Sequence, residues 1–168
     1  MPSRENICLE CGLCCDGTLF NQATIAENEA IDPAYFFEIT TNSEGLKQFK
    51  QTCCYLKGKM CSIYDHRPYS VCDRYQCKTL KKYIADEITY DHAIASIYTL
   101  ASLRDSILEQ LKSDFPQIEG ETILRKLINL EKFIELNDFK LEQRKKHSQL
   151  FLDIGKFNFI VGKYFLES

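Results

Sequence analysis

The nine cysteines of this 168-residue chain constrain it more than any other feature, because all of them lie between Cys8 and Cys77. The N-terminal stretch Met1–Asn6 is polar and charged, and the apolar run of a secretory signal does not follow it. We therefore expect a cytoplasmic protein, in which clustered thiols bind metal or perform redox chemistry more often than they form structural disulfides. An odd number of cysteines also cannot pair completely within one chain.

The first cysteine group has the spacing of a metal-binding segment. Cys8, Cys11 and Cys14 are each separated by two residues, and Cys15 follows at once. Two-residue gaps let successive thiolates turn toward one ion, as in zinc knuckles and iron–sulfur loops, and Gly12 can adopt the positive φ of a tight loop. Adjacent side chains point in different directions. We therefore expect one cysteine of the Cys14–Cys15 pair to join Cys8 and Cys11, while the other serves a second metal or bridges two.

The second cysteine group contains Cys53, Cys54, Cys61, Cys72 and Cys77. Four thiolates fill one tetrahedral zinc site and eight fill two, so the count favours two metal centres with one thiol left over. A single centre stays open as an alternative. The C-x2-C-x2-C spacing also begins the bacterial ferredoxin motif, so an iron–sulfur redox protein or enzyme is the second hypothesis. A disulfide-rich interaction module is the third and least favoured.

The cysteines and their neighbours together resemble a known family. The first motif reads C-x-x-C-G-x-C-C; C-x-Y-L follows from Cys53, C-S-I-Y-x-x-R-P runs from Cys61 to Pro68, and a pair at Cys72 and Cys77 closes the pattern. This order resembles the bacterial CxxCxxCC proteins (YkgJ-type), which are described as zinc- or iron-chelating domains. The resemblance covers roughly the first half of the chain, and so many spaced elements are specific together.

The resemblance implies a metal-chelating protein that holds zinc or iron ions in one or two centres, without naming a reaction or deciding whether the chain is an enzyme. It also implies that Cys54, which falls where the family often carries proline, is not a ligand. The implied metal ligands are Cys8, Cys11, Cys14, Cys15, Cys53, Cys61, Cys72 and Cys77.

Two side chains beside the middle motif are candidates for supporting the ligands. Two tetrathiolate zinc sites carry about four surplus negative charges, which Arg67 would offset while donating hydrogen bonds to sulfur or backbone. The alternative for Arg67 is a surface salt bridge with Asp65 or Asp73. His66 could ligate a metal or donate to a sulfur ligand, and its alternative is an ordinary surface residue.

Apolar residues recur at helical spacing beyond Cys77, which predicts three helices. The first begins at the N-cap Asp91 and stops before Pro116. The second and third span about residues 121–137 and 138–152. The tail over residues 157–165 fits neither the helix period nor the strand period.

The first half predicts less regular structure: a cysteine loop over residues 7–20, a short helix over 23–30 and a short strand over 35–40. The expected fold is mainly α, with a small irregular cysteine-rich metal-binding half (residues 1–77) packed on a helical half (residues 78–168) as one compact unit.

Charge and hydropathy exclude two classes of partner. Lys and Arg number 21 and Asp and Glu 24, for a net charge of −3, so we expect no nucleic-acid partner. The basic run Arg144–His147 is interpreted as a solvated helix face. The apolar stretch Leu150–Leu166 is interrupted by charges at Asp153, Lys156 and Lys163, so we expect no membrane span. Metal ions are the expected partners.

Overall fold

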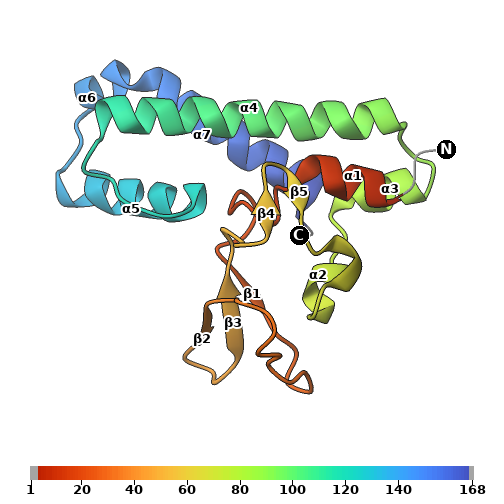
Figure 1. Cartoon of the computed structure of the whole chain (residues 1–168). Helices are drawn as coiled ribbons and strands as arrows, with labels where there is room; N and C mark the ends of the chain where they lie inside the picture. The colour runs from red at the N-terminus through yellow and green to blue at the C-terminus, as the bar shows by residue number, and fades with distance from the viewer. Residues whose placement is uncertain (1–3, 167–168) are drawn as a thin grey trace.

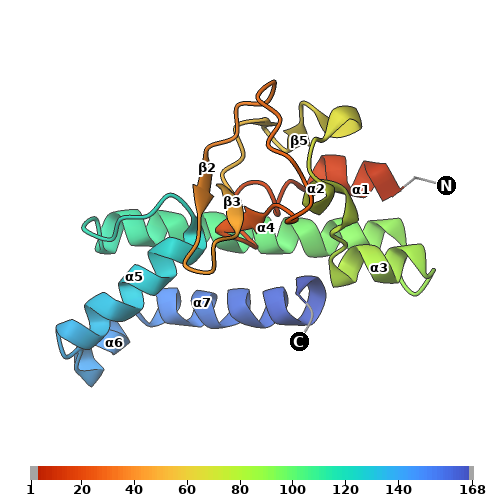
Figure 2. The same ribbon diagram turned by 90° about the horizontal axis from the view of Figure 1, so that it is seen from below.

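The computed structural model describes residues 4–166 and is mainly α-helical, as the sequence predicted (Figures 1 and 2). The helices are α1 (Arg4–Cys11), α2 (Ser70–Arg74), α3 (Lys78–Ile84), α4 (Tyr90–Asp114), α5 (Ile123–Leu136), α6 (Leu141–Lys146) and α7 (Ser148–Ile160), with a 3-10 turn η1 (Tyr64–His66) and a π-helical turn η2 (Val161–Phe165). The strands are β1 (Gln22–Thr24), β2 (Ile39–Thr41), β3 (Lys47–Lys50), β4 (Leu56–Lys57) and β5 (Met60–Cys61).

Helix α4 is the long axis on which the other helices are arranged (Figure 1). It begins after Thr89, whose side chain accepts the N–H of His92 at 3.2 Å, whereas the sequence placed the N-cap two residues later at Asp91. It ends at Asp114, close to the expected stop, because Pro116 cannot supply the N–H that another helical turn would need. Figures 1 and 2 show α7 running alongside α4, and the two helices are in contact.

The second predicted helix is confirmed as α5. The prediction of one continuous third helix was wrong. Residues 138–152 divide at His147 into α6 and α7. At this division, Nδ1 of His147 lies 2.9 Å from Oδ2 of Asp114, so the His147 side chain is held against the end of α4. The tail that fitted neither period continues α7 into η2. It buries Phe157, Val161 and Phe165, at helical spacings of four residues.

Three predictions in the N-terminal half are corrected. The expected loop over residues 7–20 begins with the helix α1, and the expected helix over residues 23–30 is replaced by strand β1. Strand β1 forms because it pairs antiparallel with β3, with Ala23 opposite Phe49, and buries Ala23 in the small apolar cluster beneath the sheet. Tertiary pairing thus overrides a weak local helix preference. The strand expected over residues 35–40 is reduced to its last part, β2.

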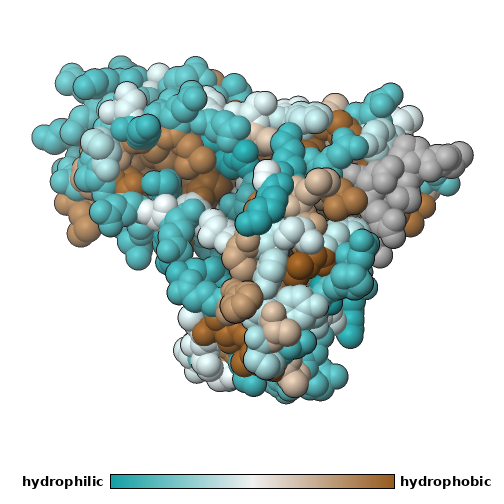
Figure 3. Space-filling model, in the orientation of Figure 1, coloured by the Kyte–Doolittle hydropathy of each residue, from teal (hydrophilic) through white to brown (hydrophobic). Residues whose placement is uncertain are grey.

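The main core draws side chains from both ends of the chain. Ile7, Leu13 and Leu19 from the cysteine-rich half join buried residues of α4, α5 and α7 in one cluster. The sheet β1–β3–β2 projects from the helices on its own small cluster around Phe49 and Tyr69 (Figures 1 and 3). Among residues 4–166, no helix combines the length and the apolar character that crossing a bilayer requires.

Candidate metal centre

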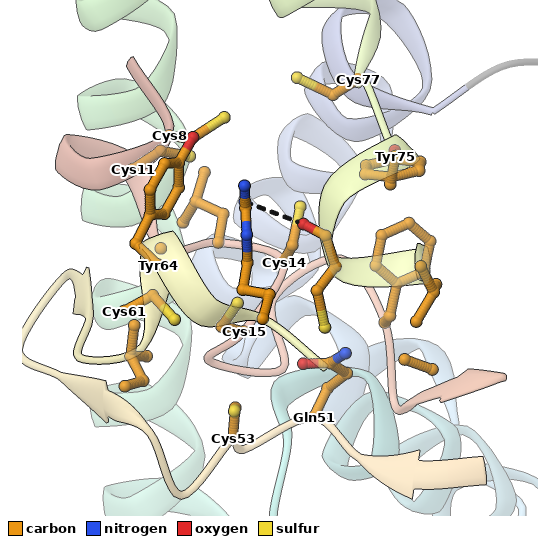
Figure 4. A pocket seen from close by; sticks show the side chains of 18 of the residues that line it. Cys8, Cys11, Cys14, Cys15, Gln51, Cys53, Cys61, Tyr64, Tyr75 and Cys77 are labelled. Atoms are coloured by element: carbon orange, nitrogen blue, oxygen red, sulfur yellow. Dashed lines mark hydrogen bonds between the residues drawn. The ribbon is translucent and has the colours of Figure 1, made fainter. Parts of the chain in front are cut away.

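One cavity gathers eight of the nine cysteines (Figure 4). It has a volume of about 360 Å³ and lies where α1, the β4–β5 hairpin, α2 and the start of α3 meet. The cysteines that line it are Cys8, Cys11, Cys14, Cys15, Cys53, Cys61, Cys72 and Cys77. The ninth, Cys54, is exposed outside this cavity, and its thiol donates to the carbonyl oxygen of Phe36 at 3.3 Å. No disulfide joins the nine, all of which lie in the described part of the chain.

Helix α1 and the turn after it position the first four thiols. Cys8 and Cys11 are three residues apart on α1, so they share one face of the helix. Gly12 then ends the helix with φ +67°, and a Cβ at this position would stand 2.9 Å from the carbonyl oxygen of Lys59. The carbonyl of Gly12 accepts the N–H of Cys15 at 2.9 Å, which closes the tight turn that carries Cys14 and Cys15 to the cavity.

Backbone hydrogen bonds hold the next thiols against that turn. The N–H of Cys53 donates to the carbonyl oxygen of Cys15 at 2.7 Å. The carbonyl of Cys53 accepts the N–H of Leu56 at 3.0 Å, and Leu56 pairs with Cys61 across the β4–β5 hairpin. Residues far apart in sequence are thereby fixed on one wall of the cavity.

The last two cysteines come from short helices. Cys72 lies in α2, and Cys77 is the N-cap of α3. The Cys77 sulfur accepts the N–H of Leu80 at 3.4 Å, a hydrogen bond that a thiolate would strengthen.

Burial favours the protonated form of several of these thiols. It raises the pKa of Cys15 and of Cys72 to about 12, with further increases from neighbouring thiolate charges. Burial raises the pKa of Cys11 and Cys14 as well, again with contributions from neighbouring cysteines. Since the thiolate is the form that binds metal, a cation must displace protons here, and its binding weakens as the pH falls.

Arg67 lines the same cavity with a side chain that is only 18% exposed. Its guanidinium donates to the carbonyl oxygen of Cys72 at 3.1 Å, the contact drawn as a dashed line in Figure 4, and to Asp73 Oδ1 at 2.8 Å. It also lies 3.9 Å above the ring of Tyr64. Arg67 therefore contacts the backbone of a candidate ligand and also forms a salt bridge with Asp73, while its compensation of thiolate charge stays a prediction.

His66, unlike the adjacent Arg67, lies outside the cavity. It is exposed, it is not among the residues that line the cavity, and its carbonyl oxygen accepts the hydroxyl of Tyr35 at 2.7 Å.

Sequence reasoning missed Gln51, which also lines the cavity (Figure 4). Its side chain is 7% exposed, and its Oε1 has no hydrogen-bond partner among the described residues. A buried carbonyl without a partner is costly, so this oxygen is a polar feature of the cavity that calls for a donor or a cation. Gln51 lies between Lys50 and Thr52 in the sequence, and this polar setting gave no signal for its role.

Sequence reasoning also missed the support of the first cysteine turn by α4. Asp16 accepts the N–H of Thr18 at 2.8 Å and forms an ion pair with Arg104, which also donates to the Thr18 hydroxyl at 3.1 Å. The turn after Cys15 is therefore anchored to the long helix. The ion pair links side chains 88 residues apart in sequence, a distance over which no local motif gives a signal.

The thiols line the cavity, but their sulfur atoms do not converge on a single position. Among residues 4–166, no three His, Cys, Asp or Glu side chains already stand in the arrangement of a metal site. The chemistry of the lining nevertheless fits a thiophilic cation, because it combines eight soft sulfur donors with a guanidinium and an unpartnered amide oxygen.

A family model matches residues 7–93, a range that contains all nine cysteines. The chain belongs to the CxxCxxCC family. That family is described as a "Putative zinc- or iron-chelating domain", which agrees with the resemblance drawn from the motifs. The match ends just inside α4, so the CxxCxxCC region contains the residues that line the cavity, except Ile97. Comparison with the curated proteins and with the solved structures gave no match.

Proposed function

We propose that this protein chelates zinc or iron through the eight cysteine thiolates that line the cavity. One observation carries the proposal: the eight cysteines of the family pattern face one space, while Cys54, the thiol outside the pattern, faces another. Thiolates hold zinc, and iron in clusters, with high affinity. The membership in a metal-chelating family supports the same function.

The arrangement favours holding a cation over any particular reaction. The residues that line the cavity would supply sulfur ligands and a compensating positive charge from Arg67. Since binding a cation to deprotonated thiols is coupled to folding, a large part of the binding free energy would appear as stability of the cysteine-rich half. The proposal requires a reducing environment, because oxidised thiols do not ligate metal.

The test is elemental analysis of protein purified without air, compared between matched variants. We expect zinc or iron in the wild type and in Cys54→Ser, and loss of metal in Cys11→Ser and Cys61→Ser. Equal metal loss in the Cys54→Ser variant would contradict the ligand assignment. Brown colour with acid-labile sulfide would assign the site to an iron–sulfur cluster instead of single ions.

A further inference from the structure

We infer that the eight thiols form two separate four-sulfur centres that meet at the peptide bond between Cys14 and Cys15. This inference rests on the proposed function and deepens it. The helix-side group contains Cys8, Cys11, Cys14 and Cys77. The strand-side group contains Cys15, Cys53, Cys61 and Cys72.

The helix-side group is built on the helical core. All four of its cysteines pack against the main apolar cluster that contains the buried residues of α4. Helices α1 and α3, which carry or begin at three of them, contact each other, and both contact α4. Figure 4 shows the four in the upper part of the cavity.

The strand-side group is built on the turn and hairpin below. The hydrogen bond from Cys53 to Cys15 and the strand pairing of Leu56 with Cys61 tie three of its members together. The fourth, Cys72, packs against the small cluster beneath the sheet and not against the helical core. Figure 4 shows Cys15, Cys53 and Cys61 below the helix-side group.

The adjacent cysteines explain why two centres form and not one. Neighbouring side chains diverge, so Cys14 and Cys15 cannot both reach one tetrahedral ion without strain, whereas each completes a set of four. Two tetrathiolate zinc ions would carry about four surplus negative charges. The Arg67 guanidinium contacts the strand-side group at Cys72, and because it is also paired with Asp73 it offsets only part of that charge.

The experiment titrates the reduced, metal-free full chain with zinc alone and counts bound ions by native mass spectrometry. Alkylation of unprotected thiols, mapped by peptide mass, identifies which cysteines hold zinc. We expect two zinc ions in the wild type and in Cys54→Ser. Cys14→Ser should keep one zinc and protect the strand-side group, and Cys15→Ser should keep one zinc and protect the helix-side group.

A measurement on the wild type guards against variants that fail to fold. With one equivalent of zinc, four thiols of a single group should become protected together. Protection spread over both groups, or a single zinc that protects all eight thiols, would overturn the two-centre inference and leave the proposed function standing. A wild type that binds neither zinc nor iron would overturn the proposed function itself.

Discussion

At the scale of single residues, Arg67 is a positive charge that contacts the backbone of a candidate ligand. Its contacts with Cys72 and Asp73 predict that Arg67→Met lowers zinc affinity about tenfold, because a charge-assisted hydrogen bond contributes about 1.5 kcal/mol or more. The zinc affinity of Arg67→Lys should lie between those of the wild type and Arg67→Met, since lysine keeps the positive charge but lacks the planar guanidinium. Competition with a chromogenic chelator measures the affinity. The control is His66→Ala, because His66 does not line the cavity and its replacement should leave zinc affinity at the wild-type value. Wild-type zinc affinity in Arg67→Met would show that Arg67 forms only a salt bridge with Asp73 and does not support the ligands.

Gly12 also lines the cavity, and the space around its Cα leaves no room for a side chain. Gly12 and Gly58 both have positive φ, but only at Gly12 would a Cβ meet a neighbour, the Lys59 carbonyl oxygen at 2.9 Å. We expect Gly58→Ala to cost about 1 kcal/mol of unfolding free energy from backbone strain alone, and Gly12→Ala to cost at least about 1 kcal/mol more from the clash. Urea unfolding of the metal-free proteins measures both. Equal costs would show that the backbone at Gly12 moves aside freely.

At the scale of helices and strands, two threonine caps differ in what surrounds them. Thr89 caps α4 at the surface, whereas Thr122 caps α5 while 6% exposed and also donates to Oδ1 of Asn21. We expect Thr89→Ala to cost about 1 kcal/mol of unfolding free energy. Thr122→Ala should cost about 2 kcal/mol of unfolding free energy, because it also removes the partly buried hydrogen bond to Asn21. Thermal unfolding followed by circular dichroism measures the pair, and a smaller cost at Thr122 would contradict this assignment of its role.

The spacing of apolar residues predicted the helices that bury one face against the core. Helices α4 and α5 were placed to within about two residues, because their caps and apolar stripes are local signals. Strand β1 was missed, because it exists through pairing with β3, more than twenty residues later. The family resemblance singled out the eight cysteines that line one cavity, but the sequence gave no sign of the buried Gln51, whose position depends on how distant segments meet.

At the scale of the whole molecule, one core connects the cavity to the helical half. Leu13 lies between Gly12 and Cys14, yet it is buried in the same cluster as Phe157 of α7. Because a side chain from the cysteine turn and one from the C-terminal helix share this core, loosening either should loosen both. We therefore expect the cysteine-rich and helical halves to unfold in a single transition.

Phe157→Ala tests this coupling from a site that does not line the cavity. Phe157 is fully buried, so the substitution should cost about 3–5 kcal/mol of unfolding free energy. In zinc-loaded protein, it should lower the midpoint of helix loss, measured by circular dichroism, and the midpoint of thiol alkylation by the same amount. The control is Phe159→Ala on the same helix, which is 65% exposed and should change stability by no more than about 0.5 kcal/mol. If helix loss shifted while the alkylation midpoint stayed in place, the cysteine-rich half would be an independent folding unit held by its metal, and the shared core would contribute packing without cooperativity.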